Sequence, residues 1–99
     1  MTLPAARLTD MDTLHDCGIP LRAKGSINVF VNGLPWSRLT DINTVHIING
    51  KDPCSKPHVG FISKGSVRTF INGLPAGRLS DNVTTCGVVA QGSINTFAG

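Results

Sequence analysis

A phrase of eight residues occurs three times in this chain of 99 residues, and its recurrence limits the possible folds more than any other feature. The copies are LPAARLTD from Leu3, LPWSRLTD from Leu34 and LPAGRLSD from Leu74. Each is followed by a second phrase: KGSINVFVNG from Lys24, KGSVRTFING from Lys64 and QGSINTFAG from Gln91. Repeats of this length are supersecondary units that bury their apolar faces only against one another. We therefore expect residues 1–99 to form one domain of three units, 3–33, 34–73 and 74–99.

The composition excludes several classes of protein. Hydrophobic residues make up 40% of the chain and charged residues 15%, with 11 Gly and 6 Pro, which is typical of a turn-rich globular domain and not of a disordered segment. No apolar run approaches the roughly 20 residues of a membrane helix, and no signal peptide is recognisable, so we expect the chain to remain in the cytosol where it is made. The net charge is +3, but the nine Lys and Arg residues are dispersed, so nucleic-acid binding is not expected.

The second phrases predict short strands. Gly or Pro interrupts almost every stretch that a helix would need, which favours a mostly β fold. In the segment 26–31, alternation places Ile27, Val29 and Val31 on one face and Phe30 on the other. Asn32-Gly33 follows, as Asn72-Gly73 follows the equivalent segment, and Asn-Gly favours tight hairpin turns because both residues tolerate positive φ. Each junction between units is therefore predicted to be a β-hairpin turn, and Leu-Pro begins the next element, where proline suits a turn exit or a sheet edge.

Side chains that bind metals occupy the same position in all three units. The residues twelve positions after Leu3, Leu34 and Leu74 are His15, His46 and Cys86. A third histidine, His58, follows a long insertion, whose residues 48–57 are a loop by their turn chemistry. Cys thiolates and His nitrogens are preferred ligands of zinc, usually in a tetrahedron. We therefore expect one structural zinc ion, with the ligands His15, His46, His58 and Cys86.

The two remaining cysteines have no equivalents in the other units. Three cysteines cannot all pair within one chain, and a cytosolic protein keeps them reduced, so a disulfide framework is not expected. We expect Cys17 and Cys54 to be small, half-buried thiols, although Cys54 is an alternative ligand in place of His58.

Two further sets of equivalent residues have predicted roles. The arginine and aspartate of each phrase lie three positions apart, and we expect them to form structural ion pairs across a turn: Arg7 with Asp10, Arg38 with Asp41, and Arg78 with Asp81. The aromatic set consists of Phe30, Phe70 and Phe97. Either a bulge turns these rings inward, or they form an exposed set that binds a partner, since large exposed apolar sets usually mark interfaces.

The chain resembles the PAAR-repeat family over essentially its whole length. Pro4-Ala5-Ala6-Arg7 spells the family motif, and Pro35-Trp36-Ser37-Arg38 and Pro75-Ala76-Gly77-Arg78 are variants of it. The resemblance implies a small cone of short β-hairpins with internal pseudo-threefold symmetry, and a zinc ion near its apex held by His15, His46, His58 and Cys86. It also implies that the broad end of the cone binds a homotrimeric spike protein, either VgrG of bacterial type VI secretion systems or the related spike of a contractile phage tail.

The resemblance implies a mechanical function. We expect a non-enzymatic tip that caps and sharpens a membrane-puncturing spike and helps to attach effector proteins. It would be assembled in the bacterial cytoplasm and ejected with the spike into a target cell, or form part of a phage tail. Two residues precede the first phrase and none follows the last, so no attached effector domain is expected.

The alternative is a small zinc-dependent hydrolase. A catalytic zinc keeps one coordination position open and needs a nearby general base, whereas four protein ligands close the shell. The chain contains no Glu, so it also lacks the H-E-x-x-H motif of one large class of zinc hydrolases. The sequence therefore favours the tip over the hydrolase.

Overall fold

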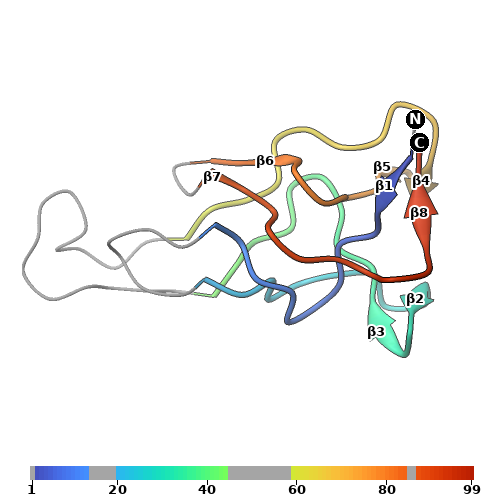
Figure 1. The fold of residues 1–99 in the computed structure, drawn as a ribbon, viewed down its shortest axis with the longest axis horizontal. Coiled ribbons are helices and arrows are strands. Elements are labelled where there is room, and N and C mark those ends of the chain that lie inside the picture. The colour runs from blue at the N-terminus through green and yellow to red at the C-terminus, as the bar shows by residue number, and fades with distance from the viewer. Residues whose placement is uncertain (1, 14–19, 45–58, 85–86) are drawn as a thin grey trace, which may run out of the picture.

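The computed structural model describes residues 2–13, 20–44, 59–84 and 87–99, and the described chain is built from very short strands (Figure 1). These residues contain no helix, and therefore none that is long and apolar enough to cross a membrane. The strands form four antiparallel pairs, which confirms the predicted mostly β fold. They are β1 (Leu3–Pro4), β2 (Phe30–Val31), β3 (Leu34–Pro35), β4 (Phe70–Ile71), β5 (Leu74–Pro75), β6 (Asn82–Val83), β7 (Gly87–Val88) and β8 (Phe97–Ala98).

The predicted hairpins at the unit junctions are confirmed. Strand β2 pairs with β3 across the two-residue turn Asn32-Gly33, and β4 pairs with β5 across Asn72-Gly73. All four turn residues have positive φ, 55° at both asparagines and 79° and 81° at the glycines. This is the type I′ geometry that matches the twist of antiparallel strands and that Asn-Gly adopts at little cost.

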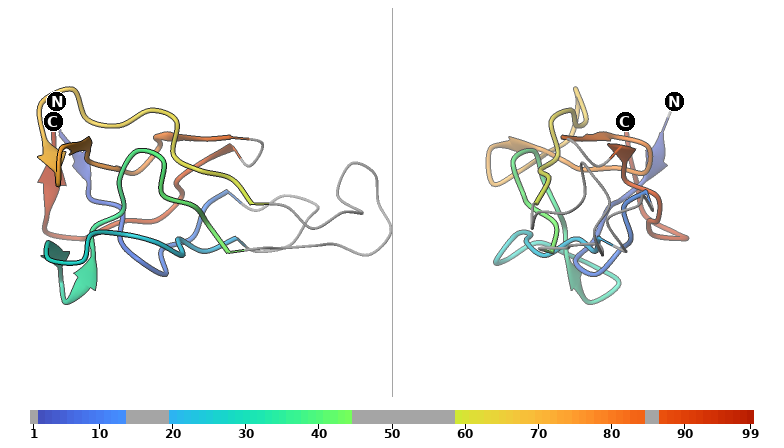
Figure 2. Two further views of the ribbon diagram at one scale, coloured as in Figure 1. Left: turned by 180° about the vertical axis from the view of Figure 1, so that it is seen from behind. Right: turned by 90° about the vertical axis from the view of Figure 1, so that its left-hand side faces the viewer.

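The first and last strands form a third pair of the same kind. Phe97 of β8 lies opposite Pro4 of β1, as Phe30 lies opposite Pro35 and Phe70 opposite Pro75. We call these three strand pairs the corners and include in each the four residues before its phenylalanine, 26–29, 66–69 or 93–96, and the residues that connect the paired strands; the end-on view in Figure 2 places the corners around the periphery of the molecule. Strands β1 and β8, from opposite ends of the sequence, thus form one corner, whereas each of the other two corners is a continuous hairpin.

The predicted strand over 26–31 is wrong in its first half. Only Phe30–Val31 pairs with another strand, because the Oγ of Ser26 accepts the backbone N–H groups of Asn28, at 3.1 Å, and Val29, at 2.9 Å. A serine side chain that bonds the backbone in this way competes with extended structure. Ile27 therefore lies in a bend and is 90% exposed, instead of sharing a buried face with Val31. Ser66 and Ser93 form the same turn in the other two units.

The three repeated phrases hydrogen-bond to one another in a closed order. The N–H of Ala6 donates to the carbonyl of Gly77 (3.0 Å), that of Gly77 to Ser37 (2.9 Å), and that of Ser37 to Ala6 (2.9 Å). These residues occupy the same position in the three units, so each unit contacts both of the others. The approach is close, because a Cβ on Gly77 would lie 2.7 Å from the Ser37 carbonyl oxygen, which explains why the third phrase departs from alanine here.

Each phrase ends in a turn that its own ion pair closes, which confirms the predicted pairing. Arg7 donates from Nε and Nη2 to the carboxylate of Asp10 at 2.9 Å, and this carboxylate also accepts the backbone N–H of Arg7 at 2.8 Å. The hydrogen bonds that Arg7 donates to the Asp10 carboxylate raise the pKa of Arg7, against a smaller opposing effect of burial. The pairs Arg38–Asp41 and Arg78–Asp81 repeat the arrangement at 2.9 and 2.8 Å.

Candidate functional site

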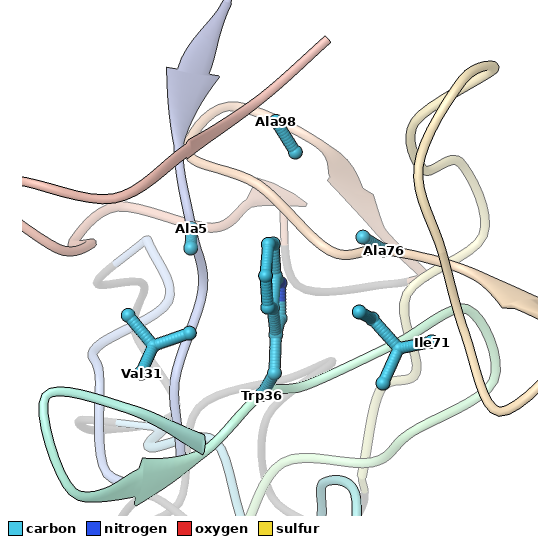
Figure 3. Close-up of a cluster of buried hydrophobic side chains, with 6 residues drawn as sticks. All are labelled: Ala5, Val31, Trp36, Ile71, Ala76 and Ala98. Atoms are coloured by element: carbon cyan, nitrogen blue, oxygen red, sulfur yellow. The ribbon is translucent and has the colours of Figure 1, made fainter. Parts of the chain in front are cut away.

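The corners rest on an apolar cluster centred on Trp36 (Figure 3). Trp36 is 8% exposed, and its Nε1 donates to the carbonyl of Gly77 at 3.0 Å. The side chains around it are small or aliphatic: Ala5, Val31, Ile71, Ala76 and Ala98. In the three phrases Trp36 is equivalent to Ala5 and Ala76, so one large and two small side chains fill the space between the units. This explains why the second phrase carries tryptophan where the first and third carry alanine.

Six apolar side chains are exposed at the three corners. Phe30, Phe70 and Phe97 are 54%, 55% and 49% exposed, so the structure has the exposed alternative and not the inward bulge. Three aliphatic side chains accompany them and are more exposed still: Ile27, Val67 and Ile94. Each corner therefore presents one aromatic and one branched aliphatic side chain to solvent.

Sequence reasoning missed the aliphatic members of this set. Alternation assigned Ile27 to the same face as Val31, which is buried, whereas the serine turn reverses its direction. The signal that would have found it is the Gly-Ser pair before each residue, at 25–26, 65–66 and 92–93. Serine after glycine favours a turn over a strand, because its hydroxyl bonds the following backbone.

Polar side chains tie neighbouring corners together. Ser26 Oγ donates to Asn72 Oδ1 and Ser93 Oγ donates to Asn32 Oδ1, each at 2.6 Å. The same asparagine oxygens accept from Arg38, at 3.0 Å, and from Arg7, at 2.9 Å. Each of these two hairpin turns is thus held by the serine of another corner and by the arginine of the phrase in its own unit. These bonds fix the backbone from which the exposed apolar side chains project.

One of the three contacts between corners differs from the other two in its polar residues. Asn32 Nδ2 donates to Asn95 Oδ1, and Asn72 Nδ2 donates to Asn28 Oδ1, both at 2.8 Å. In the remaining corner Gly99 takes the place of the turn asparagine, and its carbonyl oxygen accepts from Ser66. Arg68 stands where the other corners have Asn28 and Asn95. The contact between the β4–β5 and β1–β8 corners therefore has Arg68 and Gly99 at the positions where the other two contacts have a pair of amides.

The predicted zinc ligands His15, His46, His58 and Cys86 lie outside the described residues, as do Cys17, Cys54 and the predicted loop 48–57. Among the residues that the structure describes, no three His, Cys, Asp or Glu side chains form a group that could hold a metal ion. The predicted zinc site therefore remains a prediction.

The residues that lead toward these ligands are paired across the units. Thr13, Thr44 and Thr84 each lie two positions before a predicted ligand. Their N–H groups donate to the carbonyls of Val88 (2.8 Å), Leu21 (2.7 Å) and Phe61 (2.9 Å), each in another unit. Figure 1 places strand β6, which Thr84 directly follows, and strand β7, which contains Val88, away from the corners. Equivalent backbone positions that meet at one end are compatible with a shared ion bound by His and Cys donors.

A buried polar cluster includes the residues directly before Thr13 and Thr44. Arg22 Nη2 donates to Asp12 Oδ2 at 2.7 Å, Asn43 Nδ2 donates to the same oxygen at 2.9 Å, and Arg22 Nη1 donates to the carbonyl of Asp41 at 3.0 Å. The Arg22 and Asp12 side chains have no exposed surface. Side chains without exposed surface cannot meet a substrate, so the cluster is structural.

The comparisons with known proteins assign no family. Neither the family models nor the curated proteins gave a match to this chain.

Proposed function

We propose that this chain is a non-enzymatic tip of the PAAR-repeat type that caps a homotrimeric spike. The observation that carries the proposal is the threefold recurrence of one corner, each with an exposed phenylalanine and an exposed branched aliphatic side chain. A homotrimer presents every surface element three times around its axis, and a chain with three like corners complements it. Exposed apolar side chains gathered in this way usually mark an interface.

In this proposal the corners form the broad end of a cone with pseudo-threefold symmetry, and a zinc ion lies near its apex. His15, His46, His58 and Cys86 would hold the ion. This placement is supported by the backbone hydrogen bonds of Thr13, Thr44 and Thr84 to other units, because each threonine lies two positions before one of the three equivalent ligands. A closed structural zinc site can contribute about 10–16 kcal/mol of apparent binding free energy to a small fold. It would make rigid an apex that is too narrow to hold an apolar core.

The proposed action is mechanical. The spike and its tip would assemble in the bacterial cytoplasm, and contraction would drive them through a target envelope, as in a type VI secretion system or a contractile phage tail. A rigid tip concentrates the applied force on a small area of membrane. Effector proteins would travel with the spike by binding to the tip.

A binding experiment with a VgrG-like trimeric spike tests the proposal. We expect one chain per trimer, measured as the mass of the complex by native mass spectrometry. Replacing Phe30, Phe70 and Phe97 by serine together should weaken binding at least about 100-fold, because buried aromatic anchors dominate interface energies. The fold should persist, since all three rings are half exposed in the free chain.

The matched control is Phe61→Ser, which removes a phenylalanine of similar exposure, 42%, that lies outside the corners. This variant should bind the spike like the parent chain. Equal loss in both variants, or a stable complex of one chain with one spike monomer, would contradict the proposed capping surface.

The zinc ion has a separate test. His46→Ala should remove one equivalent of zinc per chain, measured by elemental analysis, and lower the melting temperature strongly. An unchanged zinc content would exclude His46 as a ligand. A zinc ion with an exchangeable bound water, together with hydrolytic activity, would favour the hydrolase over the tip.

A further inference from the structure

In one buried layer, the three equivalent contacts between units differ in the chemistry of their side chains. The backbone bridges Arg22 to Asn43, Ile62 to Val83, and Val89 to Asp12, and the six residues stand at equivalent positions of the three units. All six are buried. Ile62, Val83 and Val89 are aliphatic and pack in one cluster with Ala6, whereas Asp12, Arg22 and Asn43 form the hydrogen-bonded cluster described above.

We propose that the cluster of Asp12, Arg22 and Asn43 determines which unit packs beside which. Its bonds join the first unit to the second: Asn43 donates to Asp12, and Arg22 donates to the carbonyl of Asp41. Of the other two bridged contacts in the described part of this layer, Ile62–Val83 is wholly aliphatic, and Val89–Asp12 sets an aliphatic side chain against Asp12, whose carboxylate is bonded within the polar cluster. This inference is independent of the proposed spike-tip function.

The backbone does not distinguish the units. The bridges in this layer are the same at all three contacts, and so are the hydrogen bonds of the phrases. A chain whose units were docked in another order, or against the like unit of a second copy, would keep these bonds. The ion pairs Arg7–Asp10, Arg38–Asp41 and Arg78–Asp81 do not discriminate either, because each lies within a single turn.

The buried charges do discriminate. In the native order Asp12 accepts from both Arg22 and Asn43. In a shifted order, Asn43 and Asp41 would no longer face the first unit, and Arg22 would lie against aliphatic side chains. A buried ion pair that loses its bonds to Asn43 and to the Asp41 carbonyl leaves buried polar groups unsatisfied, whereas aliphatic side chains of similar volume exchange at small cost. Single buried polar residues fix register in coiled coils by the same physics.

The chain itself supplies the substitutions for a test, because the other units have aliphatic residues at the same positions. The variant with Asp12→Val and Arg22→Ile makes the first unit resemble the third and second. We expect it to fold but to populate more than one arrangement, seen as additional backbone amide signals by NMR or as species of higher mass by native mass spectrometry. Val83→Ile, an aliphatic change in the same layer, is the control and should give a single monomeric species.

A second variant moves the cluster by one unit and guards against the case in which the first variant does not fold. It combines Asp12→Val, Arg22→Ile, Asn43→Asp, Ile62→Arg and Val83→Asn, so that the same three side chains now join the second unit to the third. We expect one monomeric species with one set of amide signals. The proposal is overturned if the first variant is already a single monomeric species, or if the relocated cluster fails to give one.

Discussion

The three units pack against one another in two buried layers, one around the apolar side chain of Trp36 and one around the charged side chain of Arg22. Around Trp36 the units meet through apolar contacts, with one large ring and two alanines at the three equivalent positions. Around Arg22 they meet on one side through hydrogen bonds to a buried ion pair of the first unit, and on the other through aliphatic side chains. In both layers the backbone repeats and the side chains do not. Three indole rings would not fit the space that one fills, and three like charges would repel one another, so a closed arrangement of repeats needs unlike residues inside.

The two layers have different roles in this small repeated fold: one stabilises it, and the other selects a single arrangement of the units. Burial of Trp36 removes a large apolar surface from water and so favours folding directly. A buried ion pair gains little net stability over aliphatic residues of similar volume, because both charges lose their hydration. The apolar layer should therefore supply stability, and the polar layer should supply the order of the units. The following predictions test this division.

The largest effect is expected in the apolar layer. Trp36→Ala should lower the free energy of unfolding by about 3–5 kcal/mol, toward the upper end, because the small neighbours of the ring cannot fill the cavity. Denaturant unfolding followed by circular dichroism measures this, since the variant loses the only tryptophan. Phe61→Ala, at a partly exposed ring, should cost far less. A similar loss in both variants would mean that the layer around Trp36 has no special part in stability.

Single and double substitutions should behave differently in the polar layer. Asp12→Ala leaves the buried guanidinium of Arg22 without its carboxylate and should cost about 3 kcal/mol, toward the lower end of the range for broken buried pairs. The bond from Arg22 to the Asp41 carbonyl accounts for the smaller value. Asp12→Val combined with Arg22→Ile should restore most of this loss in the same unfolding experiment. If the double variant is as unstable as the single one, the polar layer contributes stability as well as order.

The turns of the three phrases should respond alike, unlike the two layers. Asp41→Ala removes the carboxylate that accepts from the backbone and the guanidinium of Arg38 and should cost about 1–3 kcal/mol. Asp10→Ala and Asp81→Ala should give the same loss within about 0.5 kcal/mol, because their bonds are equivalent. Thermal unfolding of the three variants provides the comparison. A marked difference among them would show that the turns are not interchangeable.

The smallest effect is a gain in stability. Thr9, Thr40 and Ser80 occupy the same position of the three turns with φ of 74°, 74° and 71°, which is unfavourable for side chains other than glycine and worst for β-branched ones. Thr40→Gly should raise the free energy of unfolding by up to about 1 kcal/mol, since the relief of strain exceeds the entropy that glycine adds to the unfolded chain. Ser80→Gly, which removes no β-branch, should gain less. A loss of stability at Thr40 would show that its side chain contributes more than its backbone costs.

Local rules of the chain predicted some elements well. Asn32-Gly33 and Asn72-Gly73 form the expected turns because their preference for positive φ needs no help from the rest of the fold. The Arg–Asp pairs follow for the same reason, since each closes within four residues of its own phrase.

Other features depend on contacts that no local pattern reveals. Nothing in the sequence distinguishes Arg22 and Asp12 from surface charges, whereas the structure buries both side chains completely. The sequence likewise gives no reason for Trp36, whereas the structure packs it against Ala5 and Ala76. Ile27 was misplaced because the alternation of apolar residues competes with the hydroxyl of Ser26. Of the candidate site, the exposure of Phe30 was one of two open alternatives, and the metal ligands remain expectations from the sequence.

The pairing of β1 with β8 has a consequence for how the chain is connected. The gap between Gly99 and Leu3 stands where Asn-Gly closes the other two corners, and the flanking strands pair in the same register. A short linker across that gap, with new ends opened at Asn32-Gly33, would give a circular permutant that keeps every strand pair. The position of the chain termini among the three corners is then set by the connectivity of the chain and not by packing.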